Sequence, residues 1–154
     1  MRKDTRLSRS LHVLIHMADQ QPMTSAQIAR ILQTNSVVVR RTMAGLREAG
    51  LVESKGGRGG GWSLLRGLEA ITLLEVHNAV SGDALFCIGW GSEHSGCLVE
   101  AAVNQHIGEA LEAAEALLLE RLGAVTLAQI RADMDSEQWA GFRAALSGPE
   151  APRT

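Results

Sequence analysis

The stretch Thr24–Gly50 reads TSAQIARILQTNSVVVRRTMAGLREAG and decides the fold. Thr24 is followed three residues later by Gln27, which is the capping-box pattern that begins a helix. A short helix is therefore expected to follow Thr24 and to end near Leu32. Residues 33–35 would form the turn that separates it from the next helix.

The second helix is expected to run from a cap at Asn35 or Ser36 to about Ala49. Gly50 follows where helices commonly end in a left-handed residue. Three apolar residues recur at spacings of four and three and would face inward: Val39, Met43 and Leu46. Three arginines would lie outside this stripe: Arg40, Arg41 and Arg47.

The segments on either side complete one pattern. Residues 8–18 have helical apolar spacing, and two extended segments, 51–54 and 62–65, flank the glycine-rich tip Lys55–Gly61. Helix, helix, turn, helix and hairpin is the order of a winged helix-turn-helix. The fold class that we predict is mainly α, with a small β-hairpin wing and a long C-terminal dimerisation helix.

The second half of the chain is expected to be helical around one loop. Residues 70–80 predict a helix, 81–97 a loop, 98–122 a long helix ended by Gly123, and 126–134 and 136–146 short closing helices. Five apolar residues of the long helix repeat every four and three positions as a heptad seam: Val103, Ile107, Ala110, Ala114 and Leu117. The predicted domains are 1–82 (DNA binding), 83–97 (sensor loop), 98–146 (dimerisation) and 147–154 (disordered tail).

Charge divides unevenly along the chain. Residues 1–66 hold eleven Lys/Arg and four Asp/Glu, a net of +7, and residues 67–154 hold four and thirteen, a net of −9; together they give the −2 of the whole chain. Such asymmetry favours a polyanionic partner for the first half, although two solvated faces of different charge would look alike. Aromatic residues are scarce, which argues against binding of unpaired bases by stacking.

These features together predict binding of double-stranded DNA. The second helix of a helix-turn-helix places its first residues against base edges in the major groove, where arginine suits guanine, asparagine suits adenine and valine packs on the thymine methyl group. A basic, glycine-rich tip suits the phosphates or the minor groove better than a nucleotide-binding loop, because an extended segment follows it. The predicted DNA-binding residues are Thr24, Asn35, Ser36, Val37, Val38, Arg40, Arg41, Lys55 and Arg58.

Three motifs resemble one family of bacterial regulators. Arg47–Val52 (REAGLV), Gly59–Trp62 (GGGW) and Ala70–Val76 (AITLLEV) are similar to the IscR/NsrR/CymR family, also called the Rrf-two family. The resemblance implies a homodimer that binds a partly palindromic operator, usually as a repressor. Gly56 stands where the family usually has its wing arginine, and Arg58 lies two residues later.

The two cysteines leave three interpretations open. Cys87 and Cys97 could form a thiol switch, with His94 lowering a thiol pKa. They could bind a metal or an iron–sulfur cluster with His94 and His12, although the family's cluster site has three cysteines in this loop. They could also be small buried apolar residues. A small-molecule effector near this loop is a further alternative, and no cofactor is certain.

The remaining observations limit the function classes. The apolar runs are shorter than a membrane span, and the N-terminus does not resemble a signal peptide, so a cytoplasmic protein without membrane contact is expected. No catalytic triad, metalloprotease helix or paired carboxylate motif is evident in the sequence, so an enzyme is not expected. The alternative to a DNA-binding regulator is a redox or metal-cluster sensor in which DNA binding is secondary.

Overall fold

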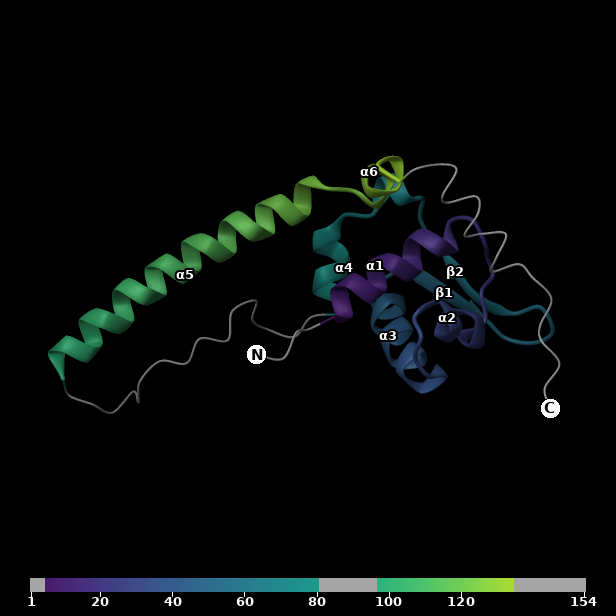
Figure 1. Cartoon of the computed structure of the whole chain (residues 1–154), viewed down its shortest axis with the longest axis horizontal. Coiled ribbons are helices and arrows are strands. Elements are labelled where there is room, and N and C mark those ends of the chain that lie inside the picture. Colours follow the sequence, from purple (N-terminus) through teal and green to yellow (C-terminus); the bar gives the residue numbers. More distant parts are fainter. Residues whose placement is uncertain (1–4, 81–96, 135–154) are drawn as a thin grey trace.

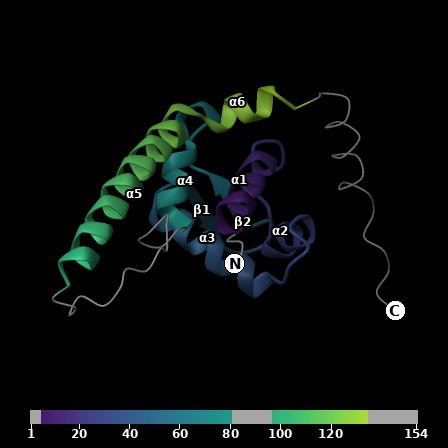
Figure 2. The same ribbon diagram turned by 60° about the vertical axis from the view of Figure 1, so that its left-hand side comes forward.

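The computed structural model describes residues 5–80 and 97–134. Figures 1 and 2 show the first four helices and the hairpin gathered in one body, from which the long helix α5 projects. The elements are α1 (Arg6–Met17), α2 (Ser25–Ile31), α3 (Ser36–Glu48), β1 (Val52–Lys55), β2 (Gly61–Leu64), the 3-10 turn η1 (Leu68–Ala70), α4 (Leu73–Val80), α5 (Leu98–Ala124) and α6 (Leu127–Ala132). The predicted winged helix-turn-helix order is confirmed.

Helix α3 is delimited at both ends by local hydrogen bonds. The turn before it closes with the Thr34 N–H donating to the Ala29 carbonyl at 2.9 Å, and Gln33 takes the left-handed conformation with φ 48°. At its end the Leu51 N–H donates to the Leu46 carbonyl at 2.9 Å, and Gly50 has φ 70°. The ends of α2 and α3 thus have the same C-terminal capping arrangement. The predicted role of Gly50 is confirmed.

Several boundaries differ slightly from those expected. Helix α1 begins two residues earlier than expected, and each strand is shifted by one residue. Helix α4 begins only at Leu73, because Thr72 and Glu75 form a capping box there. Gly123 does not end α5, which continues to Ala124. Residues 81–96 of the expected loop 81–97, the expected helix 136–146 and the tail 147–154 lie outside the described residues.

The core is aliphatic and centres on α3. Val39, Met43 and Leu46 are at most 1% exposed, which confirms the predicted inner stripe. They share one cluster with residues of α1, of α2, of the strands and of the segment just before β1: Val13, Leu14, Met17, Ile28, Leu51, Val52 and Trp62. Burial of these side chains holds α3 against the body, because removal of apolar area from water is the main stabilising contribution.

The hairpin is attached to the helix-turn-helix by its second strand. β1 and β2 pair antiparallel, and Trp62 also exchanges two backbone hydrogen bonds with Met23, at 2.8 and 2.9 Å. The Trp62 Nε1–H donates to the Ser25 hydroxyl at 3.0 Å, at the first residue of α2. These bonds set the position of the wing relative to α2 and α3.

A second joint connects α5 and α6 to the body. The Leu73 N–H donates to the Val125 carbonyl at 3.0 Å, and the Leu127 N–H donates to the Ile71 carbonyl at 2.9 Å. Leu127 is fully buried and belongs to the core cluster of the winged helix.

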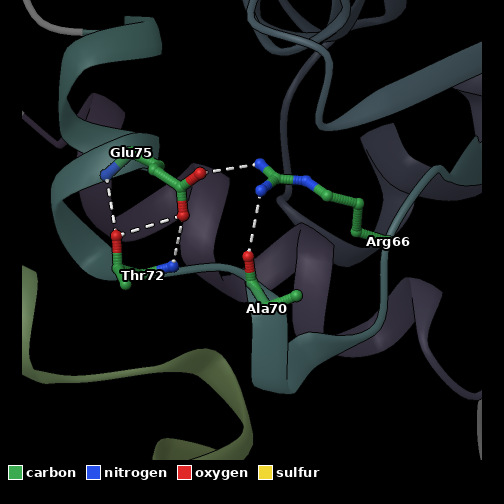
Figure 3. Close-up of polar contacts among 4 residues, drawn as sticks. All are labelled: Arg66, Ala70, Thr72 and Glu75. Carbon is green, nitrogen blue, oxygen red and sulfur yellow. Dashed lines mark hydrogen bonds and ion pairs between the residues drawn. The ribbon is translucent and has the colours of Figure 1, made fainter.

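Arg66 connects the end of the hairpin to the start of α4 (Figure 3). Its guanidinium lies 2.8 Å from Glu75 Oε1 and donates to the Ala70 carbonyl at 3.1 Å. The same Glu75 accepts the Thr72 N–H at 2.9 Å, and these bonds lower the pKa of Glu75, the Thr72 backbone bond first. The carboxylate therefore links the end of the hairpin to the start of α4.

Helix α5 has no buried residue in this single chain. Three large seam residues are 40–55% exposed: Val103, Ile107 and Leu117. Within residues 5–80 and 97–134, no helix has the length and apolar character needed to cross a membrane.

Two histidines of α1 pair one turn apart. The Nε2 atoms of His12 and His16 lie 2.9 Å apart, and His16 is 4% exposed. Burial, followed by repulsion from His12 and offset in part by Asp19, lowers the pKa of His16 to about 4. Burial also lowers the pKa of His12. Both rings are therefore neutral at pH 7, and one donates its proton to the other.

The depressed pKa of His16 predicts loss of stability in mild acid. Between pH 6.5 and 4 the unfolded chain binds a proton at this position and the folded chain does not, so the free energy of unfolding falls as pH falls. We expect the free energy of unfolding to fall by about 1–2 kcal/mol. This value allows for solvent screening, because the neighbouring His12 is exposed. Urea unfolding at pH 7 and pH 5 should show a smaller loss for His16→Gln, which cannot titrate. An equal loss in both proteins would contradict this origin.

The attachment of the wing predicts a strict requirement for glycine at position 61. A Cβ on Gly61 would lie 2.7 Å from the Met23 carbonyl oxygen, so the bridge between Met23 and Trp62 must shift. Gly61→Ala should lower the free energy of unfolding by about 1–3 kcal/mol. The control is Gly56→Ala, where a Cβ meets nothing within 4 Å, and thermal unfolding compares the two. If both variants unfold alike, the bridge does not anchor the wing.

Candidate nucleic-acid interface

The start of α3 and the tip of the hairpin form the candidate interface. In the view of Figure 1 both lie at the lower right edge of the body. Helix α2 lies between them and is bonded to the hairpin through Ser25 and Trp62. The predicted base-reading residues and the predicted wing residues therefore belong to one connected unit.

Asn35 caps α3 with its side chain. The Oδ1 atom accepts the N–H groups of Val37 and Val38, each at 3.0 Å. An asparagine that reads adenine needs both its carbonyl oxygen and its amide group. Because both lone pairs of Oδ1 are occupied by the cap, Asn35 keeps only its amide N–H groups as donors for a ligand.

Three consecutive valines at the start of α3 lie on different faces of the helix. Val37 is 67% exposed and Val38 39%, whereas Val39 is 1% exposed. The expectation that Val39 faces the core is confirmed. Two exposed valines leave apolar area in water at no benefit to the folded chain, so they suit a partner with apolar groups, such as thymine methyl groups.

Two arginines lie next to these valines. Arg40 and Arg41 are exposed, and Arg40 Nε donates to the Ser36 carbonyl at 3.3 Å. This bond directs the Arg40 side chain back toward the first turn of α3. The positive end of the helix dipole, two guanidinium groups and two valines thus occupy the same end of α3.

The wing tip carries Arg58 between two left-handed glycines. Gly57 and Gly59 have φ 88° and 80°, a conformation that L side chains rarely adopt. Arg58 is exposed, whereas the Lys55 ammonium lies 3.0 Å from Glu53 Oε1. Of the two predicted wing cations, Arg58 is therefore the one without an acidic neighbour in the described part of the chain.

Thr24 acts as the cap of α2. Its hydroxyl accepts the Gln27 N–H at 3.2 Å and donates to Gln27 Oε1 at 2.9 Å. The predicted capping box is confirmed, and the residue is exposed at the surface.

Of the predicted sensing residues, the structure describes His12 and Cys97, and they lie apart within the single chain. His12 faces His16 on α1, whereas Cys97 stands at the start of α5, far from α1 in Figures 1 and 2. Cys87 and His94 lie outside the described residues. No group of three His, Cys, Asp or Glu side chains suited to a metal occurs among residues 5–80 and 97–134. These residues do not by themselves form a cluster site.

Cys97 is exposed at the N-cap of α5. The nearby backbone N–H groups of Glu100 and Val99 favour the thiolate and lower the pKa of the Cys97 thiol. A lowered pKa favours the thiolate, which is the reactive form.

The sequence analysis did not predict one pocket on the surface. A pocket lies between α1, α3 and α4, next to the close approach of Gly45 to Ala79. The glycine in the middle of a helical pattern was the available signal, because such a glycine often has a packing reason.

Comparisons with known proteins agree with this fold. Residues 3–133 match the model of the Rrf2 family, described as an iron-dependent transcriptional regulator. YwnA of Bacillus subtilis (strain 168), named as an HTH-type transcriptional regulator, is 28% identical over 128 residues, which cover 82% of this chain and 95% of YwnA.

Two solved structures are similar over most of their length. A crystal structure named as a DNA-binding protein has a TM-score of 0.68 at 27% identity and covers 82% of this chain and 98% of its own. CymR (YrzC), the global cysteine regulator of B. subtilis, has a TM-score of 0.60 at 21% identity. The match covers 88% of this chain and 99% of CymR. The family and YwnA are described as transcriptional regulators and not as enzymes, and the chain belongs to the Rrf2 family of DNA-binding transcriptional regulators.

Proposed function

We propose that two copies of this cytoplasmic regulator bind a partly palindromic operator and repress transcription. In each copy the start of α3 enters the major groove, and the wing reaches the adjacent minor groove. The observation that supports this proposal is the capped start of α3, where exposed Val37 and Val38 adjoin Arg40 and Arg41. Valine contacts favour thymine, and arginine contacts favour guanine or phosphate.

The roles of the cations follow from their surroundings. Arg58 is held by a glycine tip that lets the backbone approach DNA closely, so it binds phosphate or the minor groove floor. Lys55 must first give up its contact with Glu53, which makes it the weaker contributor. The capping roles of Asn35 and Thr24 hold the two helices in position, and their remaining polar atoms contact the DNA backbone.

The homodimer is supported by α5. This helix of 27 residues is about 40 Å long, and its heptad seam is exposed in the single chain. A second α5 packed along the seam would bury this apolar area. A dimer would also place two copies of α3 on one duplex, which a palindrome requires.

For control of DNA binding we propose oxidation or alkylation of Cys97, together with Cys87. The support is the exposed thiol of Cys97 with its lowered pKa. Treatment with hydrogen peroxide should release DNA from the wild type and not from Cys97→Ser. The second candidate for this control is an iron–sulfur cluster held by Cys87, Cys97 and histidines. It predicts that protein purified without oxygen contains iron.

The DNA-binding proposal predicts a strong dependence on two arginines. Arg40→Ala and Arg58→Ala should each weaken binding to a fragment from upstream of its own gene by about 1–3 kcal/mol, or roughly tenfold to a hundredfold. Fluorescence anisotropy over a series of salt concentrations measures this, and the salt slope should fall by about one in the variant that loses a phosphate contact.

The control for charge is Arg121→Ala, which removes the same charge from the last turn of α5, outside the proposed DNA contact. It should bind as the wild type does. Wild-type affinity in both Arg40→Ala and Arg58→Ala would rule out the proposed orientation on DNA.

The dimer proposal predicts that a charge in the seam separates the copies. Ile107→Glu places two carboxylates in the apolar interface, so sedimentation should show monomers at concentrations where the wild type is dimeric. The matched control is Glu112→Gln, an exposed polar position of the same helix. A dimeric Ile107→Glu protein would show that the copies associate elsewhere.

A further inference from the structure

The histidine pair of α1 has the geometry of a chelating site. His12 and His16 lie one turn apart on the same face of the helix, and their Nε2 atoms are 2.9 Å apart. The ring centroids are separated by 4.7 Å, and the ring planes are inclined by 46°. One nitrogen of each ring is thus directed at the same small region beside the helix.

The separation of these two nitrogens fits a single metal ion. Imidazole nitrogens bind transition metals at about 2.0–2.1 Å, so both Nε2 atoms can reach one ion with an angle of about 90° at the metal. Right angles between ligands are typical of tetragonal Ni²⁺ and Cu²⁺ sites. A tetrahedral Zn²⁺ ion would require the nitrogens to move to about 3.3–3.4 Å from each other. The pair therefore favours a metal whose ligands meet at right angles.

The surroundings fix one ring and leave the other open. His16 is 4% exposed, so the packing of α1 holds its ring, whereas His12 is exposed. An ion on the exposed side of the pair can keep water in its remaining coordination positions. A metal uses one nitrogen of each ring, so the other nitrogen can keep any contact that it makes. The pair thus combines a positioned ligand with an open path for the ion.

We propose that His12 and His16 chelate one divalent transition-metal ion of the Ni²⁺ or Cu²⁺ type through their Nε2 atoms. In the metal-free pair one Nε2 carries a proton and donates it to the other. On binding, this proton passes to water and Nδ1 of the same ring takes one up, so both Nε2 lone pairs face the ion and no net proton is released. Neither cysteine takes part, which separates this site from a cluster held by Cys87 and Cys97.

The binding test uses the full chain without an affinity tag, with its thiols reduced, and Ni²⁺ as the probe. Calorimetric titration should give saturable binding that an excess of Mg²⁺ does not reduce, because Mg²⁺ prefers oxygen ligands. His12→Gln should weaken Ni²⁺ binding at least about tenfold, because two ligands on one helix act together. The matched control is His106→Gln, which removes an exposed histidine of α5 and should bind Ni²⁺ as the wild type does.

NMR locates the ion in the wild type without relying on any variant. Ni²⁺ that retains water ligands is paramagnetic and broadens the signals of nearby nuclei. In ¹⁵N-labelled protein the amide signals of α1 around His12 and His16 should broaden first as Ni²⁺ is added. Circular dichroism checks that His12→Gln is folded, as expected for a change at an exposed residue.

Two results would overturn the site. The first is equal Ni²⁺ affinity in the wild type and in folded His12→Gln. The second is broadening that begins around Cys97 and spares α1, which would assign the ion to a thiolate. Neither measurement includes DNA, so failure of this site would leave the proposed function standing, and failure of DNA binding would leave this site standing.

Discussion

Burial of one narrow stripe of α3 is the constraint on which the rest of the molecule depends. Val39, Met43 and Leu46 are removed from water by the core, so the helix can rotate little about its axis. Val37, Val38 and Arg41 must then face outward, whatever their own preference for water. Asn35 completes the arrangement by bonding the first N–H groups of the helix, which keeps its start ordered while it is exposed. An apolar and cationic helix end is thereby presented at the surface.

The remaining elements position this helix end relative to a second binding element and a second copy. The pairing of Trp62 with Met23 holds the wing beside α2, and Gly61 is needed because the backbones meet there. The contacts of Thr72 and Leu127 hold the base of α5 against the body. Both joints use backbone hydrogen bonds and buried side chains. Helix α3, the wing and α5 are therefore connected through one continuous set of contacts. α3 and α4 also meet closely where Gly45 faces the Ala79 carbonyl.

Local patterns predicted much of the fold because the interactions behind them are local. The capping box at Thr24, the stripe of α3 and the left-handed Gly50 each depend on residues within a few positions of one another. The pairing of Met23 with Trp62, the approach of Gly45 to Ala79 and the contact of Arg66 with Glu75 depend on folding of distant segments. No periodicity encodes such contacts, and they were missed.

In the candidate site, too, local features were predictable from the sequence and those set by the folded geometry were not. Exposure of Val37, Val38 and Arg40 followed from the helical period, whereas the use of Asn35 as a double acceptor required the geometry of the cap. His12 is a candidate cluster ligand from the sequence, and in the structure it pairs with His16 one turn along α1. Their pairing follows from the helical spacing of four, but the burial that keeps both rings neutral follows from the packing of α1.

Hydroxyl-radical footprinting on the fragment that the protein binds tests the central claim most directly, because it measures how many copies of α3 meet one duplex. If α5 joins two copies whose reading helices enter successive major grooves, two protected segments should appear, related by the symmetry of the site. Their centres should lie about 10 base pairs, or a multiple of one helical turn, apart. A single protected segment, or two at a spacing unrelated to the helical turn, would contradict the account.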